Sequence, residues 1–165
     1  MKVFRKGILF AGVVFLRLCS AYAQDAYEPD DATAEAKFCF YNSLAQQHTI
    51  HSATDEDWVY FYGREGYPYT FWVENLGSDL DCAFEVFTAT DTSTPVFMID
   101  DGWWGEDELQ SYIATGTGKY YIRISNAGGN IPSDPGYEFR ITEDTGASNL
   151  TVEQQGGGLL LTWEP

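Results

Sequence analysis

The feature that most constrains the fold is a series of short segments in which apolar and polar residues alternate. Tyr69, Phe71 and Val73 share one face of residues 69–74, and the same alternation runs through residues 82–86, 119–125 and 137–142. A period of two is typical of strands with one buried and one solvated face. No segment has a convincing helical period, so a parallel α/β fold, which needs crossover helices, is excluded.

Further strand candidates lie close together along the chain. They are residues 37–41, 46–51, 57–62, 96–99 and 109–114. Short strands at this spacing, joined by polar loops that contain glycine and proline, are typical of antiparallel two-sheet folds. The sequence therefore predicts an all-β fold, an antiparallel two-sheet β-sandwich.

Residues 1–23 have the features of a secretory signal peptide. They begin with basic residues, continue with an apolar run over 8–16, and end in a small-x-small cleavage site at 21–23. The apolar run is short for a membrane span, and an uncleaved anchor is the alternative. We expect Cys19 to be lost with the signal, because the residues before it, Arg17 and Leu18, are not the small ones of a lipoprotein signal. The protein is predicted to be secreted, periplasmic or on the cell surface.

The net charge of the chain disfavours some classes of binding partner. Beyond residue 23 there are 25 acidic residues and five basic ones, a net charge of −20. With no basic patch, we expect no nucleic-acid partner, and no membrane insertion after signal removal. An acidic surface favours divalent cations. The 11 Phe, 11 Tyr and 5 Trp of the whole chain argue against disorder and provide for a sizeable core.

Two cysteines remain after signal removal, Cys39 and Cys82. In an oxidising compartment they could form a disulfide that closes a loop of about 40 residues, which would contribute roughly 3–4 kcal/mol. The alternative is two buried thiols on separate strands, since sequence spacing does not give the Cα separation.

The acidic residues at the start of the mature chain form a candidate metal site. The strap, residues 25–31, has four carboxylates around Pro29, which should keep it extended. Calcium binds six to eight oxygen ligands. The candidate carboxylates, from two segments, are Glu28, Asp30, Asp31, Asp55 and Asp57. The alternative is that these are solvated turn residues, because Asp is common in turns.

A second acidic stretch, residues 100–108, contains Trp103 and Trp104 between glycines. An exposed pair of this kind could stack on sugar rings or on a protein surface. The alternative is that one Trp closes the edge of the sandwich, because large aromatic residues are usually mostly buried.

No catalytic motif is present, and we expect the chain not to be an enzyme. The histidines, His48 and His51, are three residues apart, which in an extended strand places them on opposite faces and disfavours a zinc pair. There is no nucleophile-elbow sequence and no phosphate-binding glycine loop before a helix. A glycosidase carboxylate pair would need a cleft, which a small sandwich does not obviously offer.

Four stretches, taken in order, resemble the bacterial pre-peptidase C-terminal domain. They are residues 25–31, 55–61, 116–124 and 136–141, and the resemblance extends over roughly residues 25–143. It implies a jelly-roll-like β-sandwich without activity of its own, found beside secreted proteases and in other exported proteins. In collagen-binding members, calcium lies between the strap and an acidic turn. Here Glu28, Asp30 and Asp31 match the strap, Asp57 matches the turn, and Trp58 would offer its backbone carbonyl; Asp55 departs from the spacing.

Residues 145–165 differ from the rest of the chain. A polar linker leads to two further strands, 149–152 and 159–165, which resemble the truncated start of a fibronectin type III domain. The predicted organisation is a signal peptide at 1–23, a sandwich at 24–144, and a linker with this incomplete domain at 145–165.

The sequence thus predicts a non-catalytic accessory module of a secreted bacterial protein. Its partner would be a polymeric substrate, collagen or a polysaccharide, or an attached catalytic domain whose export it assists. The alternative is a structural or adhesive cell-surface protein built of tandem β domains.

Overall fold

The structure is a computed structural model that describes residues 24–144 in full and the backbone of 149–155 and 158–164. The described residues form strands and no helix, and none of them provides a helix that could cross a membrane. The strands are β1 (Lys37–Phe38), β2 (Gln46–Thr49), β3 (Glu56–Gly63), β4 (Pro68–Glu74), β5 (Cys82–Thr88), β6 (Phe97–Ile99), β7 (Glu108–Ile113), β8 (Gly118–Asn126), β9 (Gly136–Glu143), β10 (Asn149–Gln155) and β11 (Gly158–Glu164).

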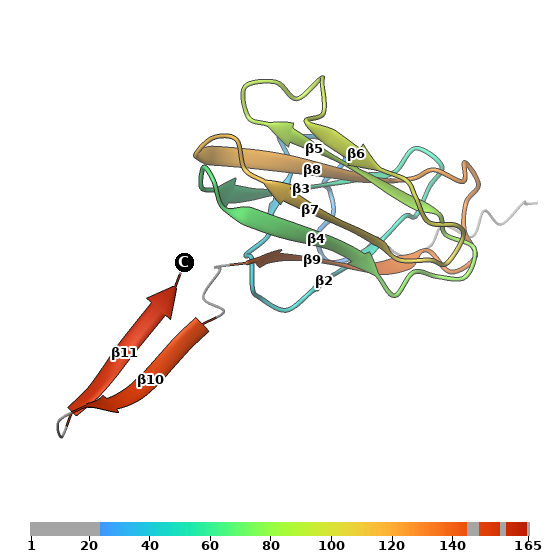
Figure 1. Cartoon of the computed structure of the whole chain (residues 1–165). Coiled ribbons are helices and arrows are strands. Elements are labelled where there is room, and N and C mark those ends of the chain that lie inside the picture. The colour runs from blue at the N-terminus through green and yellow to red at the C-terminus, as the bar shows by residue number, and fades with distance from the viewer. Residues whose placement is uncertain (1–23, 145–148, 156–157, 165) are drawn as a thin grey trace, which may run out of the picture.

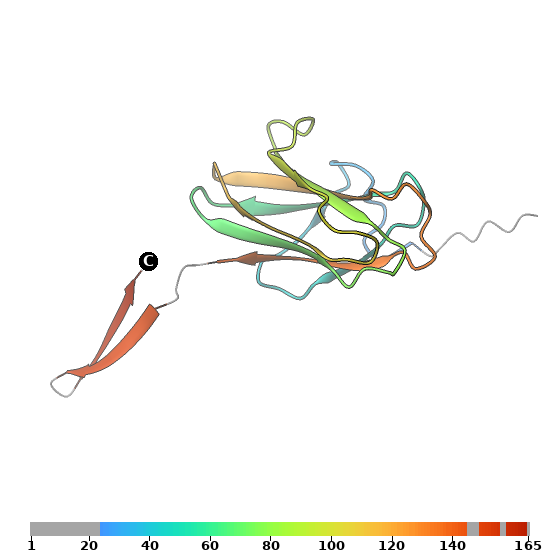
Figure 2. The ribbon, with the colours of Figure 1, turned by 45° about the vertical axis from the view of Figure 1, so that its right-hand side comes forward.

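Strands β1 to β9 form two sheets that lie over one another as layers (Figures 1 and 2). One sheet has the order β1-β3-β8-β5-β6 and the other the order β2-β9-β4-β7. The chain changes sheet at most connections, which gives a jelly-roll-like β-sandwich and confirms the predicted fold class. All pairs within the sandwich are antiparallel except β1 with β3, which pair in parallel.

The core lies between the sheets and consists of the inward positions of the alternating strands. Tyr69, Phe71 and Val73 of β4 are each 0% exposed, as the alternation predicts. Across the core, the ring of Phe61 in β3 lies 4.9 Å from that of Tyr69 and 5.6 Å from that of Phe71. Because a one-residue slip would turn these rings to solvent, aromatic packing fixes the register of both sheets.

Cys39 and Cys82 are both buried and both free, so the predicted disulfide is not formed and the alternative of two separate thiols holds. Cys39 directly follows β1, and its backbone N–H donates to Tyr60 O of β3, whereas Cys82 lies in β5. Strands β3 and β8 separate β1 from β5. Three strand spacings are about 14 Å, well beyond the roughly 4.4–6.8 Å that a disulfide spans between Cα atoms.

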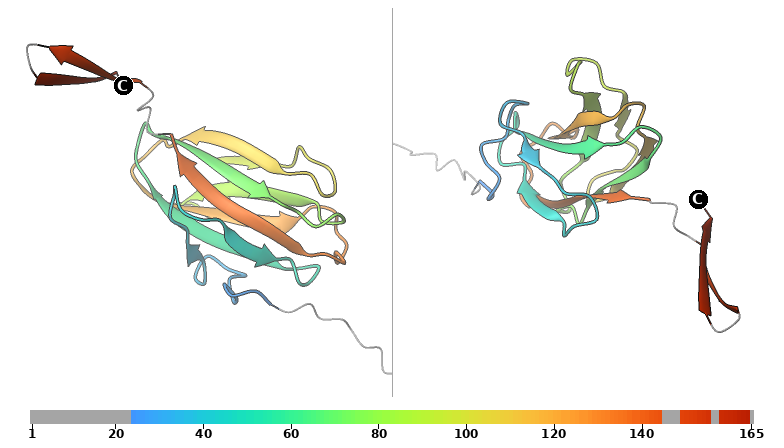
Figure 3. Two further views of the ribbon diagram at one scale, coloured as in Figure 1. Left: turned by 90° about the horizontal axis from the view of Figure 1, so that it is seen from below. Right: turned by 90° about the vertical axis from the view of Figure 1, so that its left-hand side faces the viewer.

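The strap lies along the edge of the sandwich where β1 and β2 are the outermost strands, and it is drawn in blue in Figure 3. It turns at residues 26 and 27, so the expected extended conformation is wrong. The Thr49 N–H of β2 donates to Asp25 Oδ2 (2.7 Å), and the Trp58 N–H of β3 donates to the Asp30 carbonyl (2.9 Å). The strap is therefore hydrogen-bonded to both sheets.

Strands β10 and β11 form a separate two-stranded antiparallel sheet, at the two segments predicted to be strands. Their fibronectin type III-like character and the proposed domain boundaries stay predictions. The predicted signal peptide lies outside the described residues.

Candidate metal centre

The fold brings the strap against the start of β3, and so joins the two acidic segments that the sequence singled out. Asp30 and Asp57 are 0% exposed, and Asp55 is 3% exposed. The alternative of solvated turn residues does not fit these three, because they are buried. Asp31 is exposed and lies at the rim, where its Oδ1 accepts a long hydrogen bond (3.5 Å) from the Glu56 N–H.

The side chains where the strap meets the start of β3, with the two histidines, form one cluster. In the described part of the chain, every buried side-chain nitrogen or oxygen without a hydrogen-bond partner belongs to this cluster. There are eight such atoms, and they belong to Glu28, Asp30, His48, His51, Asp55 and Asp57. Buried polar atoms in folded proteins are nearly always paired, because desolvation without a partner is costly. All eight exceptions lie at one place, and two of them, His51 Nδ1 and Glu28 Oε1, lie 2.9 Å apart as an ion pair.

Burial makes negative charge unfavourable at this site. Burial, together with the neighbouring carboxylates of Asp57 and Glu28, raises the pKa of Asp30 to about 8. Burial is also the largest cause of the raised pKa of Glu28. Without a cation, ionised side chains here would repel one another in a medium that screens them poorly.

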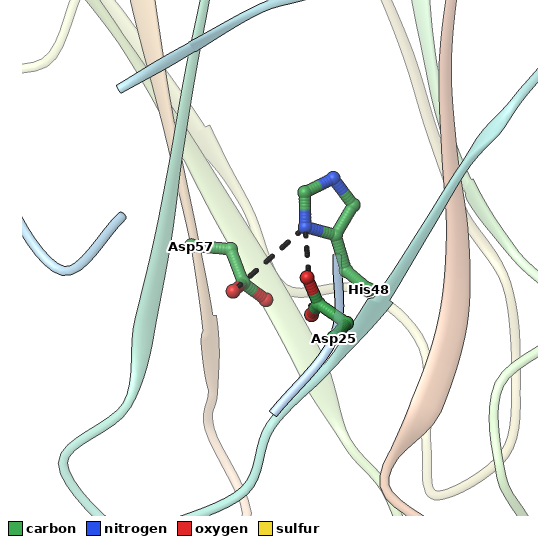
Figure 4. A group of neighbouring side chains, drawn as sticks. All are labelled: Asp25, His48 and Asp57. Carbon is green, nitrogen blue, oxygen red and sulfur yellow. Dashed lines mark ion pairs between the residues drawn. The ribbon is translucent and has the colours of Figure 1, made fainter. Parts of the chain in front are cut away.

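His48 lies at the centre of the cluster, which the sequence interpretation missed. Figure 4 shows its ring directed at Asp25 and Asp57, and its Nδ1 is 3.9 Å from Asp25 Oδ2 and 3.8 Å from Asp57 Oδ1. The side chain of His48 is 0% exposed. The available signal was the alternation itself, which places Gln46 and His48 at inward positions where polar groups need partners.

His51 also faces the cluster, so the expectation that the two histidines point apart is wrong. The alternation does not reach it, because β2 ends at Thr49. Its Nδ1 lies 2.9 Å from Glu28 Oε1 and 2.5 Å from Asp55 Oδ2, as an ion pair without hydrogen-bond geometry. The His51 backbone N–H donates to the same Asp55 oxygen.

The residues at the site fall into three groups whose ligand atoms lie within 4.8 Å of one another. Glu28, Asp30 and Asp57 form an all-oxygen group; the other two are Asp25 with His48 and Asp57, and Glu28 with His51 and Asp55. Trp58 offers its N–H to the strap, and its indole packs on Phe87 at 5.4 Å on the outer face of the sheet. Its carbonyl as a metal ligand stays a prediction.

The predicted tryptophan pair is exposed, at 76% for Trp103 and 53% for Trp104, so neither closes the edge of the sandwich. The buried side chain of Glu108 anchors the loop: it is 3% exposed and accepts a hydrogen bond from the Gly102 N–H (2.7 Å). The Gly105 N–H donates to the Leu80 carbonyl (2.8 Å). Gly105 has φ +76°, a left-handed conformation that favours glycine. The loop therefore presents both indoles to solvent from a fixed backbone.

The sequence matches no family model and no curated protein. Among solved structures, the chain is similar to the pre-peptidase C-terminal domain of collagenase from Bacillus anthracis, with a TM-score of 0.51, 13% identity, and coverage of 65% of this chain and 94% of that one. This similarity is one of fold, and it agrees with the fold that the sequence resemblance implied.

Two weaker structural similarities were found. CorA, a surface-associated copper-binding protein of Methylomicrobium album BG8, has a TM-score of 0.47, 10% identity, and coverage of 65% of this chain and 96% of that one. PliG of Aeromonas hydrophila, a periplasmic inhibitor of g-type lysozyme, has a TM-score of 0.39, 14% identity, and coverage of 66% and 99%.

Proposed function

We propose that this chain is a non-catalytic accessory module of an exported protein, and that a calcium ion clamps its strap to the start of β3. The observation that carries the proposal is the set of buried carboxylate oxygens without a hydrogen-bond partner at one site, on Glu28, Asp30, Asp55 and Asp57. The acidic surface and the signal-like first 23 residues support export. The fold supports an accessory role, because it resembles a domain that is named for its place beside a peptidase.

The all-oxygen group suits calcium. Asp30 has two unpartnered oxygens and Asp57 has one, and Glu28 adds Oε2, since its Oε1 pairs with His51; one oxygen of each residue lies within 4.8 Å of the others. Calcium takes six to eight oxygens at about 2.3–2.6 Å and accepts bidentate carboxylates. Water, Asp31 at the rim, Asp55 and the Trp58 carbonyl are the candidates for the remaining positions.

The groups that could perform chemistry are poorly placed for it. Burial raises the pKa of the Cys39 thiol to about 12 and that of the Cys82 thiol well above its ordinary value, so neither is a nucleophile at neutral pH. A pocket of about 310 Å³ lies beside residues 88–90 and 115–120, and its lining has no carboxylate, histidine or cysteine. The buried carboxylates lie under the strap, where a substrate would not reach them.

Thermal unfolding of the purified chain, in EDTA and in millimolar calcium, tests the clamp. A site filled a hundredfold above its dissociation constant adds about 2.7 kcal/mol. For about 120 ordered residues at roughly 2.1 cal/mol/K each, this raises the melting temperature by about 10 °C. Glu28→Gln should lose most of this rise. Glu65→Gln should keep it, because Glu65 is exposed and follows the far end of β3.

If calcium does not change the melting temperature of the wild-type chain, the clamp is refuted. A calcium response that Glu28→Gln leaves intact would also refute it, since the ion would then lie elsewhere on the acidic surface. Calorimetry with calcium should give one equivalent for the wild type and for Glu65→Gln.

The tryptophan loop favours a second function, adhesion to a polymer such as collagen or a polysaccharide. Two indoles on a backbone fixed by Glu108 and Gly105 resemble the exposed aromatic surfaces that mark binding sites.

The double variant Trp103→Ala, Trp104→Ala should lose co-sedimentation with insoluble collagen or polysaccharide while melting as the wild type does. Leu44→Ala, which removes an apolar side chain that is 91% exposed elsewhere, should retain it. Absence of wild-type binding to all such polymers would refute this function and favour a structural module among tandem β domains.

A further inference from the structure

We propose that His48, Asp25 and Asp57 form a second metal position beside the calcium group, one that takes a divalent transition ion such as Zn²⁺. This goes beyond the calcium clamp, because it assigns a nitrogen ligand and a different class of ion. The two positions would share Asp57, which belongs to both the all-oxygen group and the histidine group.

The distances from His48 Nδ1 to the nearest carboxylate oxygens suit an ion bound between them better than direct hydrogen bonds. Its Nδ1 lies 3.9 Å from Asp25 Oδ2, 3.8 Å from Asp57 Oδ1 and 3.8 Å from Asp30 Oδ2. All three are too long for a hydrogen bond, since a contact of about 3.6 Å or more is not one. Two ligands that each lie about 2.1 Å from one zinc ion are roughly 3.4 Å apart in tetrahedral geometry, so a contraction of a few tenths of an ångström would complete the site.

The other ring nitrogen of His48, Nε2, faces the side chain of Gln46. Gln46 directs its amide Nε2 to the Phe38 carbonyl (3.0 Å), which leaves Gln46 Oε1 facing His48 Nε2 at 3.4 Å. An amide oxygen only accepts, so Nε2 is the nitrogen that faces an acceptor and Nδ1 is the nitrogen that faces the three carboxylates. In this orientation Nδ1 is placed to bind a cation together with those carboxylates. Metal-binding histidines typically donate their other N–H to an oxygen in this way.

The imidazole and one of its partners are held in position by aromatic residues. Tyr27 of the strap stacks on the His48 ring at 4.6 Å, and Tyr137 of β9 stacks on it at 5.5 Å. The Tyr137 hydroxyl also donates a hydrogen bond to Asp57 Oδ2, which leaves Oδ1 directed toward His48. Asp25 is fixed by the backbone N–H groups of Tyr27 and Thr49, both at 2.7 Å. The site is therefore organised before an ion binds.

His51 contacts its carboxylates more closely than His48 does. Its Nδ1 approaches Glu28 and Asp55 to 2.9 and 2.5 Å, which leaves no room for an ion between them. Its side chain is 19% exposed, against 0% for that of His48. We assign His51 to a direct ion pair and His48 to the metal position. Imidazole with carboxylates suits zinc and its neighbours in the first transition row, whereas calcium prefers oxygen alone.

Calorimetric titration of Zn²⁺ into the purified chain without a histidine tag, in millimolar calcium, tests the proposal. We expect one equivalent of zinc in the wild type and at least about a 100-fold weaker affinity in His48→Gln, because a ligand is lost. His51→Gln should change the zinc affinity by less than about threefold. His48→Gln should still bind calcium, and this also shows that the variant is folded.

Nitrogen-detected NMR of the two imidazoles provides the direct readout. Zinc should shift the Nδ1 resonance of His48 and leave Nε2 in its protonated form. Zinc bound through His51, zinc binding that survives in His48→Gln, or zinc that calcium expels competitively would each overturn the second position. If the chain binds zinc through His48 but does not respond to calcium, the inference stands and the calcium clamp fails.

Discussion

Asp30→Asn gives the sharpest test of the charge balance in the cluster, because it removes a buried carboxylate and keeps its shape. Asp30 is 0% exposed, and burial among carboxylates raises its pKa from 3.8 to about 8. At pH 7 the folded chain holds a proton that the unfolded chain has released. One pKa unit corresponds to about 1.4 kcal/mol, so the wild-type chain loses up to roughly 4 kcal/mol at pH 7 when no cation is bound.

The asparagine variant avoids this cost. Relaxation of the metal-free cluster reduces the difference, and we expect Asp30→Asn to be more stable than the wild type in EDTA by about 1–3 kcal/mol, or about 4–12 °C in melting temperature. In calcium the wild type should gain about 2.7 kcal/mol at a hundredfold saturation. The variant should gain little, because its amide supplies one neutral oxygen in place of a bidentate carboxylate.

The assay is calorimetric unfolding of both proteins at pH 7, in EDTA and in calcium. Asp31→Asn is the matched control: it removes the neighbouring carboxylate of the strap, which is exposed, and should not stabilise the chain in EDTA. If Asp30→Asn is less stable than the wild type in EDTA, then the chain itself compensates the Asp30 charge, and the reasoning that a cation is needed is wrong.

Three further predictions concern other features of the molecule. In EDTA, the free energy of unfolding should fall as the pH rises from about 4 to 8, since the folded chain keeps the Asp30 proton that the unfolded chain gives up near pH 3.8; calcium should remove this fall in a pH series of urea denaturations. The thiols of Cys39 and Cys82 should resist a thiol reagent at pH 8 and both react after denaturation, whereas a disulfide would yield no thiol from this pair. Gly77→Ala should destabilise the sandwich by about 2–4 kcal/mol in urea denaturation, because its Cβ would lie 1.8 Å from the Asp134 carbonyl oxygen; Gly116→Ala, whose nearest contact is 3.9 Å away, should be neutral.

Much of the sandwich could be predicted because the alternation of apolar and polar residues marks each strand within its own short segment. The inward triplet Tyr69, Phe71 and Val73 is visible in the sequence, since alternation is a local property of the strand. Strand order is not local. The sequence does not say that β3 and β8 lie between Cys39 and Cys82, so it could not decide between a disulfide and two thiols.

The metal centre could be predicted only in part, for a related reason. The acidic strap and the turn before β3 are dense enough in carboxylates to be noticed, and the structure brings them together. The direction of His51 was mispredicted because the alternation of β2 does not continue past Thr49, where the strand ends; His48 lies within β2, and nothing local to that strand links its inward position to the strap. Exposure of Trp103 and Trp104 depends on how Glu108 and Gly105 shape the loop, which composition does not reveal.

The position of the strap has a consequence for self-association. β1 and β2 each end a sheet, and they are short, with two and four residues. Open sheet edges offer unpaired backbone groups to other chains, and proteins protect them with short strands or covering loops. Because Asp25 accepts the N–H of Thr49, the strap is such a cover on β2. If the proposed cation clamps the strap, its removal should uncover this edge and allow pairing with the edge of another copy of the chain.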